Sequence, residues 1–188
     1  MRALASSKRF SVHKFYNFLK SSGIKVSKNT LYNYVQALND PFIIFPLKKF
    51  SRSHKNEEVS MPKIYFVDNG LLTIQGVNDE GRLMENLVFD ELLRRFGAEK
   101  IRYFLYNDKE VDFIIGDENG VKQIVQVCYI IEDFETRERE IKPLIKASEL
   151  LDCQNMTILT WDTEDEVDVE GKPIKFLPLW KWLLSQSL

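Results

Sequence analysis

The sequence predicts an α/β protein made of two modules: a basic helical module, then an acidic module with a mixed sheet. Charge is divided along the chain, because residues 1–60 carry 11 Lys/Arg and 3 Asp/Glu, whereas residues 61–188 carry 15 and 25. Two short segments with helical spacing come first, and strand-like alternation dominates after residue 100. A chain of 188 residues with 44% apolar residues is long and apolar enough to bury a sizeable core.

The first two helices are predicted from their apolar spacing and from their end signals. Residues 11–23 start at Ser11, a good N-cap, and end on Gly23, while residues 27–40 start at a second N-cap, Ser27. Their apolar stripes should face the core: Val12, Phe15, Phe18 and Leu19 in the first helix, and Leu31, Tyr34, Val35 and Leu38 in the second. Two short helices joined by a tight turn predict a helix-turn-helix.

Two predicted strands follow the helix pair, at residues 42–50 and 63–68, and Pro46 suits an edge strand. A helix-turn-helix followed by a hairpin is the winged-helix arrangement, and its positive charge favours contact with DNA. The alternative is a winged helix that makes only protein contacts. The DNA-reading side chains would be Lys28, Asn29, Tyr32, Asn33 and Gln36 on the second helix, with Lys48, Lys49 and Arg52 on or near the wing.

The acidic module should begin with a helix at residues 81–97, whose apolar stripe includes one carboxylate, Glu85. Three strands then follow at residues 101–107, 110–116 and 121–131, with turns at Asn107-Asp108 and at residues 117–120. A helix at about 136–151 contains Pro143, and a strand at 156–161, an acidic loop at 163–173, a strand at 173–178 and a final helix complete the chain. This order predicts a sheet with helices on both faces, and domains at residues 1–68 and 69–188.

Strand alternation brings a small group of polar side chains together. If residues 110–116 and 121–131 pair as a hairpin, Asp112, Gln126 and Cys128 can converge, with Glu85 close by on the preceding helix. An ionised carboxylate on an apolar face is costly unless it has a partner or a metal ion. We therefore take these four residues as the candidate site.

The order of the segments resembles a known arrangement. After the winged helix come KIYFVDNGLL, MENLVFDELLRRFG, EVDFII, QIVQVCY and TRERE. Together they resemble the C-terminal half of prokaryotic, especially archaeal, AAA+-type ATPases, in which a domain of unknown function follows the ATPase module. That domain is related to the PD-(D/E)xK restriction-endonuclease-like fold. The resemblance covers nearly the whole chain from about Ser11 and rests on the order of short motifs.

The resemblance implies a role for each residue of the candidate site. Glu85 matches the helix glutamate of the nuclease fold, and Asp112 matches its first-strand aspartate, which would bind the metal ion in an active enzyme. Gln126 stands where the second acid belongs, and Cys128 stands where the lysine belongs. Because Mg²⁺ prefers anionic oxygen ligands and a thiol cannot replace an ammonium group, we expect an inactive pocket with no cofactor.

Three functions remain open. The chain is expected to be a DNA-binding and interaction module associated with an ATPase module; the alternatives are a Mg²⁺-dependent nuclease with an altered site, and a protein–protein adaptor without nucleic-acid binding. The nuclease alternative needs a displaced lysine, for which the candidates are Lys109, Lys122 and Lys142. The sequence contains no GxxxxGK[ST] phosphate loop, so we expect no ATP hydrolysis by this chain alone.

The chain is expected to be cytoplasmic and not to contact a membrane. No run approaches the roughly 20 apolar residues of a membrane span, and the N-terminus lacks the apolar region of a secretory signal. Cys128 and Cys153 lie in apolar segments without metal-site spacing, which predicts buried, reduced thiols. The sequence leaves the oligomeric state open.

Overall fold

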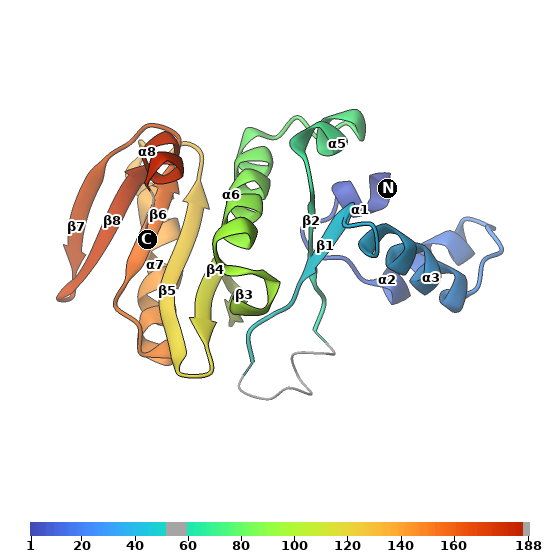
Figure 1. The fold of residues 1–188 in the computed structure, drawn as a ribbon, viewed down its shortest axis with the longest axis horizontal. Helices are drawn as coiled ribbons and strands as arrows, with labels where there is room; N and C mark the ends of the chain where they lie inside the picture. Colours follow the sequence, from blue (N-terminus) through green and yellow to red (C-terminus); the bar gives the residue numbers. More distant parts are fainter. Residues whose placement is uncertain (52–59, 186–188) are drawn as a thin grey trace. The chain divides into compact units, whose positions relative to one another are not determined.

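The computed structural model describes residues 1–51 and 60–185 (Figure 1). The chain divides into two compact units, Met1–Asn78 and Asp79–Leu188. The boundary lies ten residues beyond the position that we expected from the sequence. The two units are described separately below. Among residues 1–51 and 60–185 there is no helix that could span a lipid bilayer.

The first unit holds a helix pair and a hairpin. Its elements are α1 (Arg2–Ala5), α2 (Val12–Ser21), α3 (Lys28–Asn39), β1 (Ile44–Leu47), β2 (Lys63–Phe66) and α5 (Asn69–Ile74). Ser11 Oγ accepts the Lys14 N–H at the start of α2, and Ser27 Oγ accepts the Thr30 N–H at the start of α3, so both predicted N-caps are confirmed. The hairpin is antiparallel, with Ile44 opposite Phe66.

The core of the first unit is formed mainly by the hairpin and the N-terminal segment. Its buried apolar side chains are Leu4, Ala5, Phe10, Leu31, Ile44, Leu47, Ile64, Tyr65, Phe66 and Leu72. The predicted apolar stripes are wrong at Phe18 and Tyr34, since each is 62% exposed. In α3 only Leu31 is buried, so the stripe that meets the core is narrower than the sequence suggested.

The described part of the second unit contains a six-stranded mixed sheet with the order β3-β4-β5-β6-β8-β7. The strands are β3 (Ile101–Tyr106), β4 (Lys109–Asp117), β5 (Gly120–Cys128), β6 (Met156–Thr160), β7 (Asp165–Val169) and β8 (Lys172–Pro178). β5, β6 and β8 are parallel, and the remaining neighbours are antiparallel. Asn107 and Asp108 have φ angles of 44° and 61°, which suits the tight β3–β4 turn that we predicted.

Helices cover both faces of this sheet, as predicted. They are α6 (Glu80–Phe96), α7 (Phe134–Leu151) and α8 (Leu179–Leu184), with a short 3₁₀ turn at Ala98–Lys100. Phe89 of α6 packs against Phe113 of β4 at 6.3 Å between ring centroids, whereas α7 contacts Gln126 of β5. Val125 is opposite Phe113 and shares its face, whereas the next residue, Gln126, points to the other face. Since α6 contacts Phe113 and α7 contacts Gln126, the two helices lie on opposite faces of the sheet; Figure 1 shows α7 behind it.

One element of the second unit was predicted incorrectly, and the short helices α1 and α5 of the first unit were not predicted. We expected an acidic loop at residues 163–173, but Asp165–Val169 forms strand β7 at the edge of the sheet, antiparallel to β8. Pro143 lies inside α7 without ending it, since α7 runs to Leu151. The two cysteines are buried and unpaired, as predicted.

Candidate functional site

Asp112 and Gln126 join two strands at a point where the strands stop pairing. The register of β4 and β5 ends at Phe113 opposite Val125. One residue further along, Asp112 Oδ2 accepts the Val127 N–H at 3.0 Å, and Gln126 Oε1 accepts the Asp112 N–H at 3.1 Å. These two side chains therefore make hydrogen bonds to the backbone where the regular ladder is absent, and each is only 7% exposed.

A carboxylate that we did not predict completes this group. Gln126 Nε2 donates to Glu140 Oε2 of α7 at 2.8 Å, and Glu140 Oε1 accepts from Arg139 Nε at 3.1 Å. Glu140 is not among the four candidate site residues taken from the sequence. Glu140 lies four residues before the buried Leu144, so helical spacing from Leu144 could have shown that it faces the sheet.

Cys128 is held as a neutral thiol. Its Sγ donates to the Ile130 carbonyl oxygen at 3.1 Å. Burial raises the pKa of the Cys128 thiol to about 12, and the negative charge of Glu140 adds to this effect more than Arg139 opposes it. The position that the resemblance assigns to a lysine therefore carries neither a cation nor a thiolate at neutral pH.

Glu85 is buried in α6, as its position in the apolar stripe predicted. It forms an ion pair with Arg82, one turn earlier in the same helix, at 3.7 Å, and both side chains are less than one tenth exposed. The structure thus brings Asp112 and Gln126 into direct contact, whereas the charge of Glu85 is balanced within its own helix.

The donor set does not fit a Mg²⁺ site. Within residues 1–51 and 60–185, no three His, Cys, Asp or Glu side chains are grouped so that they could hold a metal ion. Asp112 uses one carboxylate oxygen for Val127, the Gln126 amide oxygen is neutral and already accepts a hydrogen bond, and Cys128 is protonated. A magnesium ion needs hard oxygen ligands in octahedral geometry, which these side chains do not supply.

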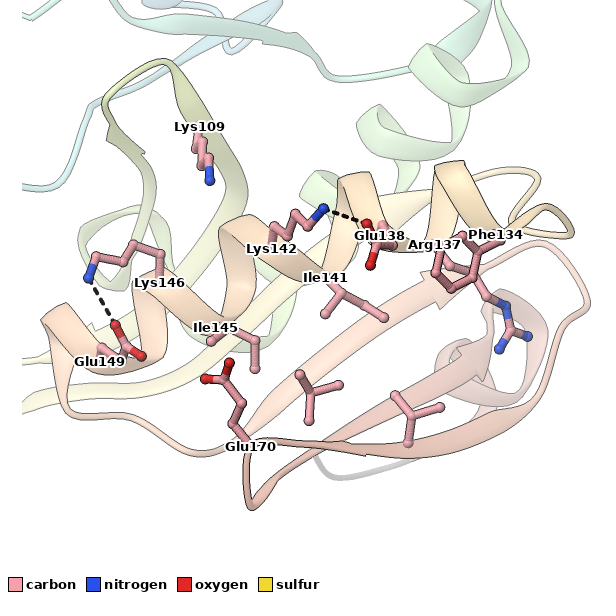
Figure 2. Close-up of a pocket in the computed structure, with 12 residues that line it drawn as sticks. Lys109, Phe134, Arg137, Glu138, Ile141, Lys142, Ile145, Lys146, Glu149 and Glu170 are labelled. Carbon is pink, nitrogen blue, oxygen red and sulfur yellow. Dashed lines mark hydrogen bonds and ion pairs between the residues drawn. The ribbon is translucent and has the colours of Figure 1, made fainter.

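A separate groove of about 630 Å³ lies between α7 and β7 (Figure 2). Its apolar lining is Phe134, Ile141, Ile145, Val167 and Val169. Lys109 and Lys142, two of the three displaced-lysine candidates, line this groove, and Lys142 pairs with Glu138. Figure 2 shows Phe134 and Arg137 at one end and Lys146 with Glu149 at the other. Charges of both signs along the groove give no preference for an anionic or a cationic ligand.

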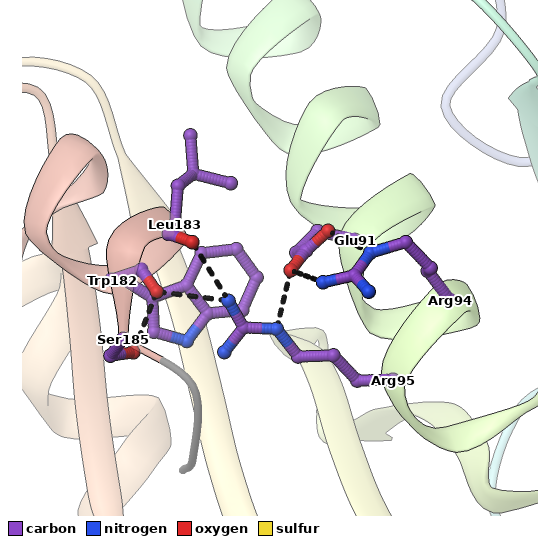
Figure 3. Close-up of polar contacts among 6 residues, drawn as sticks. All are labelled: Glu91, Arg94, Arg95, Trp182, Leu183 and Ser185. Carbon is purple, nitrogen blue, oxygen red and sulfur yellow. Dashed lines mark hydrogen bonds and ion pairs between the residues drawn. The ribbon is translucent and has the colours of Figure 1, made fainter.

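Arg95 anchors the last helix to α6 (Figure 3). Its guanidinium lies 4.5 Å from the centre of the Trp182 ring, and its Nη2 donates to the carbonyl oxygens of Trp182 and Leu183 at 3.0 and 3.3 Å. Glu91 accepts from both Arg94 and Arg95. The hydrogen bond from Arg94, followed by that from Arg95, lowers the pKa of Glu91 from 4.5 to about 2 against the opposing effect of burial.

The predicted DNA-reading face of α3 is largely open. Asn29, Tyr32 and Asn33 are exposed, with Tyr32 at 56%. Gln36 is also exposed but donates to Asp40 Oδ1. Lys28 is half-buried, and its Nζ is 2.9 Å from His13 Nδ1 and 5.2 Å from the centre of the Tyr16 ring.

The predicted wing cations lie on or beyond the hairpin. Lys48 is exposed, and Lys49 is half-buried, with its backbone N–H donated to Ser60 Oγ. Arg52 lies outside the described residues. The structure therefore describes two of the three wing cations that we predicted.

Comparison with known proteins gives relatives without an assigned activity. Residues 1–80 match a family described as a domain of unknown function, DUF8612. The chain is 37% identical over 184 residues to the uncharacterized protein MJ1544 of Methanocaldococcus jannaschii, covering 93% of this chain and 41% of that protein. It is 28% identical over 176 residues to an uncharacterized protein of Haemophilus influenzae, covering 92% and 41%. The chain thus spans about two fifths of the curated relatives that it matches. No solved structure matches it.

Proposed function

We propose that this chain is a DNA-binding and interaction module in which the basic first unit contacts duplex DNA and the second unit is a non-catalytic, nuclease-like scaffold. The observation that carries this proposal is the open face of α3. Asn29, Tyr32 and Asn33 leave their polar groups exposed on a twelve-residue helix that follows a short turn. Side chains of these types hydrogen-bond to base edges and phosphates.

A winged-helix assignment of the first unit is supported by strand pairing. β2 pairs with β1, and it also forms a bridge from Lys63 to Arg9, in the segment before α2. Phe10 N–H donates to the Pro62 carbonyl oxygen at 3.0 Å beside this bridge. A small sheet around a helix-turn-helix gives α3 a fixed support, which a recognition helix needs in order to present its outer face.

Charge favours the first unit over the second as the DNA contact. Residues 1–78 carry 12 Lys/Arg and 4 Asp/Glu, a net charge of +8. By contrast, the two loops that follow β5 and β6 carry seven Asp/Glu and no Lys/Arg, at residues 129–135 and 161–166. A phosphate backbone would be attracted to the first unit and repelled from this end of the second.

The nuclease-like assignment of the second unit is proposed from the resemblance and from its α-β-β-β-α-β order. Its lack of activity is proposed from the hydrogen bonds of Asp112 and Gln126 and from the neutral Cys128. The association with an AAA+-type ATPase module also remains a proposal. The relatives are more than twice as long as the aligned region, which leaves room in them for another module.

Duplex binding tests the proposal. We would measure the anisotropy of a fluorescent mixed-sequence duplex at several salt concentrations, with the whole chain and with a variant in which four cations become alanine: Lys28, Lys48, Lys49 and Arg52. Each lost phosphate contact should reduce the slope of log K against log salt by about 0.9. Asn33→Ala should instead change the preference among duplex sequences, because a base-edge contact carries sequence information.

A matched variant controls for net charge. Four lysines of the second unit would be changed to alanine together: Lys109, Lys122, Lys146 and Lys175. This variant has the same loss of charge but should keep the salt slope of the wild type. Equal loss of binding in both variants, or no duplex binding by the wild type, would reject the assignment of DNA contact to the first unit.

A further inference from the structure

The second unit repeatedly places a cation over an aromatic ring and pairs the same cation with a carboxylate. Arg95 lies over Trp182 and pairs with Glu91 (Figure 3). Arg137 lies 5.1 Å from the centre of the Phe176 ring and pairs with Asp165 at 2.8 Å. A third group, Lys181 with Trp180 and Glu164, has the same composition at the carboxyl end of β8.

A fourth ring at this end has the carboxylates but not the cation. Trp161 follows β6, is 52% exposed and lies against Tyr129, with 5.2 Å between ring centroids. Asp162 is its neighbour in sequence, and Glu132 and Asp133 follow Tyr129 in the adjacent loop. Among the residues that the structure describes, no cation lies over Trp161 and no ion pair involves Asp162 or Glu132.

The two loops are held next to each other by the parallel strands. Cys128 is opposite Thr160 in the register of β5 and β6, and the Trp161 N–H donates to the Tyr129 carbonyl oxygen at 3.3 Å. Thr160 Oγ1 donates to the Thr163 carbonyl oxygen at 2.5 Å, which ties the second loop to its strand. Ile130, the residue after Tyr129, is 58% exposed. These contacts fix the ring pair relative to the sheet.

The two loops that carry the rings are acidic, since residues 129–135 and 161–166 hold seven Asp/Glu and no Lys/Arg. One cation of α7, Arg139, lies close enough to Asp133 to favour its ionised form. Of the seven carboxylates at residues 129–135 and 161–166, Glu164 and Asp165 pair with Lys181 and Arg137. Asp133 accepts the Thr136 N–H at 2.7 Å, and the hydrogen bonds from Thr136 hold the pKa of its carboxyl below the usual range, so it stays ionised at neutral pH. A cation that approached Trp161 would therefore meet an exposed π face in an acidic part of the second unit.

We propose that Tyr129, Ile130, Glu132, Trp161 and Asp162 form a docking surface, here called the carboxyl-end surface, for an arginine- or lysine-bearing segment of a partner protein. The segment would place a guanidinium or ammonium group over Trp161 and its apolar atoms against Ile130. Charge complementarity favours a basic protein segment, because nucleic acids and anionic lipid surfaces are repelled by the same carboxylates. The proposal does not depend on DNA binding by the first unit.

Peptide binding to the whole chain tests the proposal. The probe is a fluorescein-labelled arginine-rich peptide, and its control is the same peptide with citrulline, which is neutral and has nearly the same shape, in place of arginine. We expect the arginine peptide to bind, the citrulline peptide to bind much more weakly, and binding to weaken with salt. In NMR spectra, the indole N–H signal of Trp161 should shift on binding, while the signals of the occupied Trp180 and Trp182 serve as internal references.

Variants distinguish peptide binding at the Trp161 ring from non-specific adhesion. Trp161→Leu keeps an apolar side chain but removes the π face, and it should weaken binding about two- to fivefold, the usual value of an exposed cation–π contact. Glu132→Gln with Asp162→Asn should weaken binding and flatten its salt dependence. Two control changes on exposed residues elsewhere, Tyr106→Ala and Glu118→Gln, should leave binding unchanged.

Several results would overturn the proposal. The arginine peptide could fail to bind, the citrulline peptide could bind equally well, or Trp161→Leu could retain full affinity. Equal weakening by Tyr106→Ala would show non-specific adhesion. If Trp161→Leu instead weakens binding of labelled single-stranded DNA or of anionic lipid vesicles, the surface recognises another class of partner and a protein segment is excluded as its ligand.

Discussion

Replacing Asp112 should distinguish a structural carboxylate from a metal ligand. Asp112 Oδ2 accepts the Val127 N–H at 3.0 Å where the β4–β5 ladder has ended. Asp112→Ala removes this acceptor, whereas Asp112→Asn keeps a side-chain oxygen that can accept the same hydrogen bond. We therefore expect the alanine variant to disturb the strand junction and the asparagine variant to preserve most of it.

The size of the effect follows from the burial of the pair. Leaving a buried donor without an acceptor costs about 1–3 kcal/mol, and because Val127 is only half-buried we expect about 1–2 kcal/mol. That range corresponds to about five- to thirtyfold faster opening of the junction. For Asp112→Asn the loss should stay below about 1 kcal/mol, the difference between a charge-assisted and a neutral hydrogen bond.

Amide hydrogen exchange of Val127, followed by NMR, measures this opening at the junction itself. Such a local measurement avoids the ambiguity of global unfolding in a chain with two units. Asp117→Ala is the control, because Asp117 accepts the Asn119 N–H in the exposed turn at the other end of the hairpin. It should leave exchange at Val127 unchanged.

Two results would refute this reasoning. If Asp112→Asn and Asp112→Ala accelerate amide exchange of Val127 equally, the charge of Asp112, not its hydrogen bond, stabilises the junction. Slower exchange of the wild type in Mg²⁺, absent from Asp112→Asn, would reveal a metal site; a ligand at 100 times its Kd stabilises a folded protein by about 2.7 kcal/mol.

Three further predictions concern other groups. Glu91→Gln should destabilise the second unit by about 1–2 kcal/mol at pH 7. The lowering of the Glu91 pKa from 4.5 to about 2 sets an upper bound of about 3 kcal/mol, and solvent screening at the exposed Arg94 reduces it. Because the pKa of Glu91 is lower in the folded protein, this stability should be present above about pH 4.5 and lost as the pH falls towards 2. Urea titrations at several pH values measure it; the same pH profile in Glu91→Gln and in the wild type would contradict a stabilising role of the Glu91 carboxylate. Cys128 should react slowly with iodoacetamide at pH 8, with mass spectrometry as the readout, because its raised pKa keeps the thiol protonated; rapid alkylation of the folded chain would disprove this. The wild type should not cleave labelled DNA or RNA in Mg²⁺ or Mn²⁺. Cleavage that disappears in Asp112→Ala would support the nuclease alternative. Cleavage gained by Gln126→Glu with Cys128→Lys would show that the scaffold lacks only the charges of an active site.

Local sequence signals predicted most elements of the second unit, because each carried its own end signals and periodicity. The helix at Glu80–Phe96 starts after an N-cap aspartate, Asp79, and is followed by Gly97, which has a φ of 80°. Strand β7 was missed because Asp165–Val169 is short and rich in carboxylates, so its local composition resembles a loop. Its strand conformation depends on pairing with β8, which lies beyond the reach of local propensity.

The candidate site was predictable only where it depended on strand alternation. Alternation correctly placed Asp112 and Gln126 together, and a single carboxylate in an apolar stripe correctly indicated that Glu85 is buried. Glu140 was missed because the acidic and basic residues around it resemble a solvated helix surface. The contact of Lys28 with His13, fifteen residues earlier, has no local signal in the sequence.

The composition of β7 has a consequence for the behaviour of the protein in concentrated solution. An exposed edge strand can pair with strands of other molecules and so begin aggregation. In β7 the side chains of Val167 and Val169 face the groove beside α7, while the carboxylates of Glu166 and Asp168 are exposed. Two molecules that met along this edge would bring these carboxylates close together, and their repulsion would oppose sheet extension. The strand thus carries its own protection against self-association.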